Sequence, residues 1–320
     1  MYVGHALLGF VLAAWVARWL GVARDRALLV GLVGGAFAVV PDLDAARTVI
    51  AVIEAGPSNV FPTTEHVWTE SWVVHRSLTH SLLTAAVAVA LAVALADARR
   101  RRREGSVVGP PALVAAGAGA LLLGTGALAD GAVGAGTMAV YVAGLVAASA
   151  LAARWRLAPR LVGVAAAVAL VSHPFGDVFM GRPPAFLYPL VERASLETVV
   201  VASDPTVNLV ALFGIELGLA WLVAWTWASC RGVRLRDRVD RTAALGAGFA
   251  ASALVIRPPT LDVAYHWALG TLATGAVVGF GPRVATTRSR RAAVVRGEAT
   301  ALAAVTAAVA SYLVAYVLVG

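Results

Sequence analysis

Long apolar runs, separated by short segments that carry most of the charged residues, recur from one end of this chain to the other. The hydrocarbon core of a bilayer is about 30 Å thick, which corresponds to roughly 20 helical residues at about 1.5 Å each. Of the 320 residues, 60% are hydrophobic and 14% are charged, with a mean hydropathy of +0.80. A soluble globular domain is much less apolar than this. The sequence therefore predicts an all-α, polytopic membrane protein.

Ten of the apolar runs have the length and composition of candidate transmembrane helices. They cover residues 3–20, 27–40, 81–97, 111–128, 131–153, 160–173, 206–229, 242–256, 263–281 and 299–319. The runs at 111–128 and 131–153 are so close together that the count depends on whether the chain reverses between them. We expect about ten transmembrane helices.

The basic residues of the chain orient these helices. All 26 are arginine, and in a ten-helix topology 21 of them fall in the loops or helix flanks of one side. The positive-inside rule makes that side cytoplasmic, so both termini are expected outside the cell membrane. The net charge of +8 does not indicate a nucleic-acid partner, because the arginines flank membrane spans instead of clustering on a soluble surface. The expected partner is membrane lipid.

Histidine and aspartate residues gather on the opposite side of this topology, in four short motifs. The motifs are Gly4-His5, Pro41-Asp42-Leu43-Asp44, His75-Arg76-Ser77-Leu78-Thr79-His80-Ser81 and His173-Pro174-Phe175-Gly176-Asp177. Imidazole and carboxylate groups together are typical ligands of divalent Zn, Mn or Fe. The shared side therefore favours a metal site at the outer face of the membrane.

The spacing within the motifs limits how the ligands can be arranged. His173 and Asp177 are four residues apart, so on a helical turn they share one face. Asp42 and Asp44 follow a proline at the end of the second helix, where a non-helical turn can point both carboxylates the same way. The two histidines of the third motif are five residues apart, so we place the first in the loop and His80 in the first turn of the third helix.

Each motif alone has an ordinary structural explanation. A single histidine at a helix end is usually interfacial or packed, and an isolated Asp-x-Asp is commonly a turn. Their joint occurrence on one side is what indicates a metal or catalytic site. A further acid, Glu216, lies in the middle of the run 206–229, where an ionisable group is costly. It could be a buried pairing partner or a neutral, protonated acid.

In this order, the four motifs resemble those of the YdjM-like family of membrane-bound, metal-dependent hydrolases, which in its bacterial namesake is linked to LexA regulation. The resemblance covers roughly residues 1–195. The family's pattern of histidine and aspartate is similar to that of zinc-dependent phospholipase C enzymes. This chain departs from the family by the long separation of His80 from His173, and by Pro174-Phe175-Gly176 where family members continue an apolar helix.

The resemblance implies a metal-dependent hydrolase with a defined set of site residues. The implied metal ligands are His5, Asp42, Asp44, His75, His80, His173 and Asp177. Asp44 could instead bridge two metals or act as the general base, so we regard Asp44 and Arg76 as candidate catalytic residues. Arg76 and Arg182 are the positive groups best placed to bind an anionic substrate. The expected metal is Zn, with Mn and Fe as alternatives.

We therefore expect residues 1–205 to form a hydrolase-like membrane core that acts at the outer face, with an activated water as nucleophile. The expected substrate is amphiphilic or phosphorylated, such as a phosphoester or a lipid headgroup. Residues 206–320 form a four-helix segment without an assigned role. The main alternative is a transporter or channel that uses the same cluster for a metal or for protons. Transporters usually place such groups near the midplane within repeated halves, whereas these motifs lie at helix ends. A metal-stabilised scaffold without turnover is a third alternative.

Overall fold

The computed structural model describes residues 2–45, 78–179, 183–191, 196–260, 264–281 and 290–319, and the regular elements among them are all helical. This agrees with the predicted all-α class. The chain divides into two compact units, Met1–Val199 and Val200–Gly320. The predicted division was at residue 205, and the separate roles that we assigned to the two parts stay predictions.

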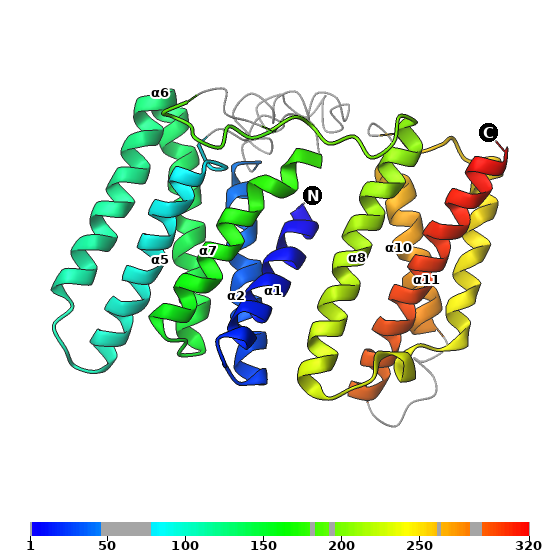
Figure 1. Cartoon of the computed structure of the whole chain (residues 1–320), viewed down its shortest axis with the longest axis horizontal. Coiled ribbons are helices and arrows are strands. Elements are labelled where there is room, and N and C mark those ends of the chain that lie inside the picture. The colour runs from blue at the N-terminus through cyan, green and yellow to red at the C-terminus, as the bar shows by residue number, and fades with distance from the viewer. Residues whose placement is uncertain are drawn as a thin grey trace, which may run out of the picture. The chain divides into compact units, whose positions relative to one another are not determined.

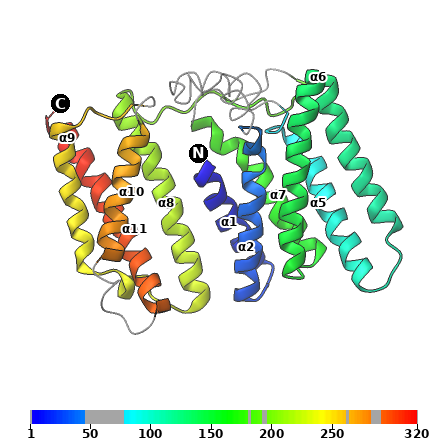
Figure 2. The same ribbon diagram turned by 180° about the vertical axis from the view of Figure 1, so that it is seen from behind.

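The described part of the first unit is a bundle of helices that lie side by side (Figures 1 and 2). Its elements are α1 (Tyr2–Trp19), α2 (Arg24–Val39), η1 (Pro41–Ala45), α5 (Leu82–Arg103), α6 (Gly109–Arg154), α7 (Pro159–Gly176) and η3 (Asp177–Phe179). The start of α1, the end of α2, the start of α5 and the end of α7 point toward the same end of this unit (Figure 1). The turns that carry arginine lie at the other end.

The helix labelled α6 is a hairpin of two helices. Its backbone leaves the helical conformation at Asp130 (φ −140°, ψ 21°) and Gly131 (φ 59°, ψ −138°), and the chain reverses there (Figure 2). The positive φ of Gly131 lies in the left-handed region that glycine adopts at little cost. The two arms touch where a Cβ atom on Gly126 would lie 2.7 Å from the side chain of Met138. The predicted runs 111–128 and 131–153 are therefore two separate helices.

Close packing between α1 and α2 brings the first turn of α1 near the end of α2. A Cβ atom on Gly34 would lie 2.6 Å from the carbonyl oxygen of Gly9, so both backbones approach each other more closely than a side chain would permit. Small residues allow this kind of contact between membrane helices. The same contact fixes the position of His5 relative to η1.

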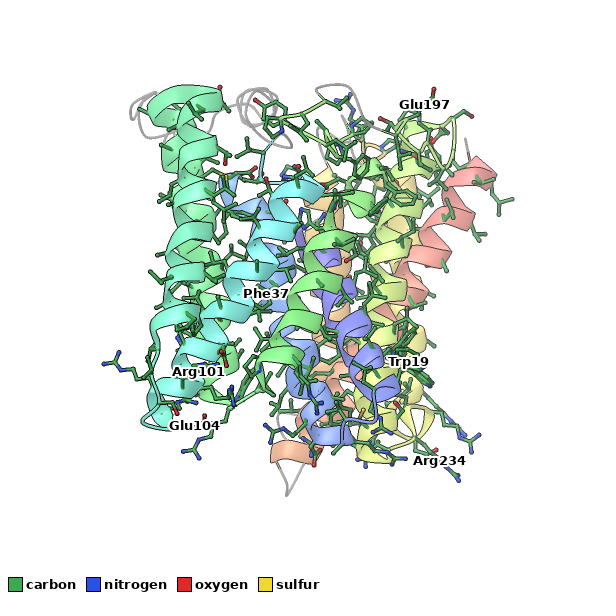
Figure 3. The ribbon with its side chains drawn as sticks, turned by 60° about the vertical axis from the view of Figure 1, so that its left-hand side comes forward. Trp19, Phe37, Arg101, Glu104, Glu197 and Arg234 are labelled. Atoms are coloured by element: carbon green, nitrogen blue, oxygen red, sulfur yellow. The ribbon has the colours of Figure 1, made fainter. Side chains whose placement is uncertain are left out.

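The core of the first unit is formed by α1, α2, α5, α6 and α7 together. Phe37, Tyr141, Leu145 and Leu170 are all buried in one hydrophobic cluster, and Phe37, which lies in the last turn of α2, is labelled in Figure 3. In addition, α7 packs against α1, α2 and α5. A central helix that touches three others holds their ends in a fixed arrangement.

The second unit is built around α11. Its described elements are α8 (Pro205–Arg231), η4 (Leu235–Arg238), η5 (Arg241–Ala251), α9 (Ser252–Val255), α10 (Ala264–Phe280) and α11 (Arg290–Val319). The last of these helices packs against α8, α10 and η5. Trp267 and Tyr312 meet edge to face in the core of this unit, with ring centroids 5.3 Å apart.

Six helical segments among the described residues are long and apolar enough to cross a membrane. They are Arg24–Ala45, Leu82–Arg103, Gly109–Arg154, Pro159–Phe179, Pro205–Arg231 and Ala293–Val319. Val3–Trp19 and Arg241–Val255 are shorter apolar helices, and the hairpin α6 is one of the six although it contains two arms. These findings support a polytopic membrane protein. The count of about ten spans and the outer position of both termini remain predictions.

Candidate metal centre

Four side chains from separate parts of the first unit meet in one buried group. They are His5 in the first turn of α1, Asp42 in η1, His173 in the last turn of α7 and Asp177 in η3. One ligand atom from each lies within 4.8 Å of the other three. Four atoms bound to a single ion at about 2.1 Å would lie roughly 3.4 to 4.2 Å apart. The longest separation within this limit would therefore have to shorten by about 0.6 to 1.4 Å for all four atoms to bind one ion.

The hydrogen bonding of His173 determines what its second nitrogen can do. Its Nδ1 lies 2.7 Å from the carbonyl oxygen of Ala38, and because a carbonyl only accepts hydrogen bonds, Nδ1 carries a proton and donates. In the neutral ring, Nε2 then carries a lone pair, which points toward carboxylate oxygens of Asp42 at 3.5 Å and Asp177 at 3.6 Å.

A lone pair that faces two carboxylates requires a positive charge between them. Nε2 of His173 and Oδ2 of Asp42 are buried, and neither has a hydrogen-bond partner among the described residues. Burying carboxylates without a compensating charge is very costly. The charge can be supplied by a metal cation or by protons on the imidazoles, and the mixed nitrogen and oxygen donors suit Zn, Mn or Fe.

His80 extends this group. Its Nε2 lies 3.1 Å from Oδ2 of Asp177 and 3.6 Å from Oδ1 of Asp42, and its side chain is fully buried. Burial disfavours the imidazolium form, but hydrogen bonding to Asp177 and Asp42 outweighs it and raises the pKa of His80 to about 10. Without a cation, His80 therefore holds a proton that offsets part of the carboxylate charge.

The position of His80 differs from the prediction that placed it in the first turn of a helix. It lies in a turn that precedes α5, because Ser81 is the N-cap and its Oγ accepts a hydrogen bond from the backbone N–H of Leu83. The same hydroxyl donates to the carbonyl of Tyr188 at 2.7 Å. These bonds attach segment 183–191 to the start of α5 and fix the turn that carries His80.

Thr79 connects Asp44 to His80. The hydroxyl of Thr79 donates to Oδ2 of Asp44 at 2.6 Å. The oxygen of that hydroxyl also lies 2.8 Å from Nδ1 of His80. A hydroxyl has one proton to donate, so Nδ1 of His80 is the donor in the second bond. This directs Nε2 of His80 toward Asp42 and Asp177. Oδ2 of Asp44 lies 3.8 Å from Nδ1 of His80. Asp44 is therefore on the opposite side of the imidazole from Asp42 and Asp177.

His5 lies against the end of α7. Its ring stacks on that of His173 with centroids 3.9 Å apart, and its Nε2 is 3.2 Å from Oδ1 of Asp177. A Cβ atom on Gly176 would lie 2.6 Å from Cε1 of His5, so this position has to be glycine while His5 is in place.

Pro174 lies within α7, and the helix continues past it to Gly176. His173 and Asp177 face the same space, as their spacing predicts.

Sequence reasoning did not single out Thr79, Gly176 or the carbonyl of Ala38. Thr79 and Gly176 lie inside the quoted motifs, but nothing in the sequence distinguishes them from spacers. The predicted site residues His75, Arg76 and Arg182 lie outside the described residues, so their assigned roles stay predictions. Glu216 lies in α8 of the second unit and is half-buried.

Comparison with known proteins agrees with the motifs. The family model of the YdjM inner membrane protein matches residues 1–257. The match extends past residue 195, where the resemblance of the motifs ends, and includes α8, η5 and α9 of the second unit. No curated protein and no solved structure is significantly similar to the chain. Because the family model covers most of its length, the chain belongs to the YdjM inner membrane protein family.

Proposed function

We propose that this protein is a membrane-bound, metal-dependent hydrolase that acts on a phosphoester, such as the headgroup of a lipid. The observation that carries the proposal is the buried group of His5, Asp42, His173 and Asp177, whose ligand atoms lie within 4.8 Å of one another. The geometry of His173 supports it, because Nε2 is directed at two carboxylates while Nδ1 is held by a backbone carbonyl.

The proposed metal is Zn, and Mn and Fe suit the same donors. A divalent cation held there supplies a Lewis acid and lowers the pKa of water toward neutrality. The chain's own residues orient the imidazoles before any substrate binds: Ala38 fixes the ring of His173, and Thr79 with Asp44 fixes that of His80. Such outer contacts typically raise metal affinity and activity.

The proposed substrate follows from where the cluster lies. Its residues come from helix ends, at the boundary between apolar helices and polar segments, where the headgroup of an amphiphile is found. We propose that this is the outer side of the membrane, and the distribution of arginine supports that orientation. Arg76 and Arg182 are proposed to bind the anionic part of the substrate. Asp44 is proposed to act on the reaction through His80 or as the general base.

The main alternative is a metal or proton-coupled transporter that uses the same residues. A transport site is expected near the middle of the membrane on broken helices. In this structure α1, α2, α5 and α7 each contribute from an end or from the turn beside it, which favours an enzyme.

The test is metal content measured beside turnover in the purified full-length protein, with a phospholipid phosphoester as substrate. We expect Asp42→Ala and His173→Ala to lose metal and to lower turnover by orders of magnitude while remaining folded. Asp97→Ala is a matched control, because it removes a carboxylate of α5 that pairs with Arg100 and Arg101, away from the group of four. A folded, metal-depleted variant with full turnover would overturn the hydrolase proposal. Metal flux into proteoliposomes without hydrolysis would identify the transporter, and bound metal with neither activity the scaffold.

A further inference from the structure

A second polar site lies at the other end of the first unit. A hollow of about 640 Å³ opens between the last turns of α5, the end of α6 and the turn that leads into α7. It is lined by Ala96, Arg99, Arg100, Arg103, Glu104, Ala153, Arg156, Leu157 and Ala158. Its volume is in the range of pockets that bind small molecules. Because α5 has 22 residues, the hollow is about 30 Å from His80 and separate from the candidate metal centre.

The charge of this hollow is strongly positive. Arg100 is paired with Asp97 at 2.8 Å and with Glu104 at 3.6 Å. No carboxylate among the described residues is within ion-pair distance of Arg99, Arg103 or Arg156, which line the same hollow. Figure 3 shows Arg101 and Glu104 at this end of α5. Three guanidinium groups thus share one space without a counterion from the described residues.

The buried end of the Arg99 side chain indicates which kind of ligand the hollow would bind. Its Nη1 is buried and has no hydrogen-bond partner among the described residues. A buried donor without an acceptor is costly, and more so when the donor is charged. The guanidinium is planar with a fork of donors that matches the oxygens of phosphate. An anion with several acceptor oxygens would satisfy Nη1 and offset the charge of all three arginines.

Hydrogen bonds from arginine side chains to backbone carbonyls hold the walls of the hollow in place. Nη2 of Arg103 donates to the carbonyl of Ala153 at 2.9 Å, which joins the end of α5 to the end of α6. Arg156 adopts a left-handed backbone conformation with φ 51°, and its carbonyl accepts a hydrogen bond of 2.9 Å from Arg26 at the start of α2. Arg156 is thus presented by a defined turn, unlike an arginine on a freely exposed helix surface.

We propose that this hollow, the arginine pocket, binds a phosphate group, carried either by an anionic phospholipid or by a soluble phosphoester. The pocket also has apolar walls, formed by Ala96, Ala153, Leu157 and Ala158, which can contact the glycerol of a headgroup. It lies at the arginine-rich end of the helices, where anionic headgroups are attracted electrostatically. The site is independent of the proposed hydrolase activity.

The test measures binding to the purified full-length protein in a neutral, phosphate-free detergent. Three probes are titrated: dioctanoyl phosphatidylglycerol, glycerol 3-phosphate, and dioctanoyl phosphatidylcholine as the zwitterionic reference. The variants are Arg99→Gln and Arg103→Gln, with Arg102→Gln as the matched control. Arg102 belongs to the same arginine run and carries the same charge, but it is exposed and does not line the pocket. If Arg99→Gln does not fold, Arg103→Gln provides the same comparison.

We expect saturable binding of one of the two anionic probes, weakened about tenfold or more in Arg99→Gln and less than about twofold in Arg102→Gln, as for a charge-assisted contact. Binding of phosphatidylglycerol alone identifies a lipid as the source of the phosphate, and binding of glycerol 3-phosphate identifies a soluble phosphoester. Equal weakening of binding in the pocket and control variants would overturn the proposal. Binding would then depend on the overall positive charge of this surface and not on the pocket. Absence of saturable binding, or equal binding of phosphatidylcholine, would overturn it as well.

Discussion

Replacing Thr79 by valine tests whether Asp44 acts on the metal site through His80. The hydroxyl of Thr79 makes two short contacts, 2.6 Å to Asp44 and 2.8 Å to Nδ1 of His80, and valine has nearly the same shape without the hydroxyl. Hydrogen bonds to charged groups contribute about 1.5 to 3 kcal/mol each. Losing the orientation of one ligand should therefore weaken metal binding by about 10- to 100-fold, or about 1.4 to 2.7 kcal/mol.

The assay is a competition titration of the purified protein with a chelating indicator, for the wild type, Thr79→Val and Thr79→Ser. The serine variant keeps the hydroxyl and should keep most of the affinity. Thr271→Val is the matched control, because Thr271 is also buried but donates only to the carbonyl of Trp267 within its own helix. Equal metal affinities in wild type and Thr79→Val would refute the reasoning that Thr79 orients His80.

Three further substitutions test the packing and the substrate contact. Gly176→Val should displace His5 and lower metal affinity, because the added atoms would collide with the imidazole. Circular dichroism should show an unchanged helix content. An unchanged metal affinity would contradict the close contact between Gly176 and His5. Gly34→Leu should separate α1 from α2 and destabilise the protein by about 1 to 3 kcal/mol or more, measured as a lower thermal unfolding temperature. Arg76→Ala should raise KM for an anionic substrate while metal content stays that of the wild type, and a loss of metal would show that Arg76 has a different role.

The convergence of the site could be predicted from the sequence because its ligands lie at helix ends. Successive helices cross the membrane in opposite directions, so every second connection lies on the same side. On this basis, one face could be assigned to His5, Asp42, His80, His173 and Asp177 without knowing how the helices pack. The start of α5 could also be predicted, since a serine before an apolar run is a common N-cap. That signal at Ser81 would have placed His80 outside the helix.

The contacts that orient the ligands could not be predicted. The bond from His173 to the carbonyl of Ala38 depends on the rotation of α7 against α2, which no periodicity specifies. The approach of Gly9 to Gly34 likewise depends on a register between two helices that are both rich in small residues. Pro174, one of the departures from the family's apolar helix, lies so near the end of α7 that only the last turn is affected.

The position of the ligands at helix ends also explains how one small space can hold so much charge. On a continuous helix face, neighbouring side chains lie about 5 to 6 Å apart between Cβ atoms, so few of them can reach one point. Here η1 and η3 bend the chain just beyond α2 and α7, which turns Asp42 and Asp177 inward toward the imidazoles. The helices meanwhile keep their own backbone hydrogen bonds and a core of apolar contacts. Folding therefore depends mainly on packing between helices, whereas the geometry of the metal centre depends on the few residues where they end.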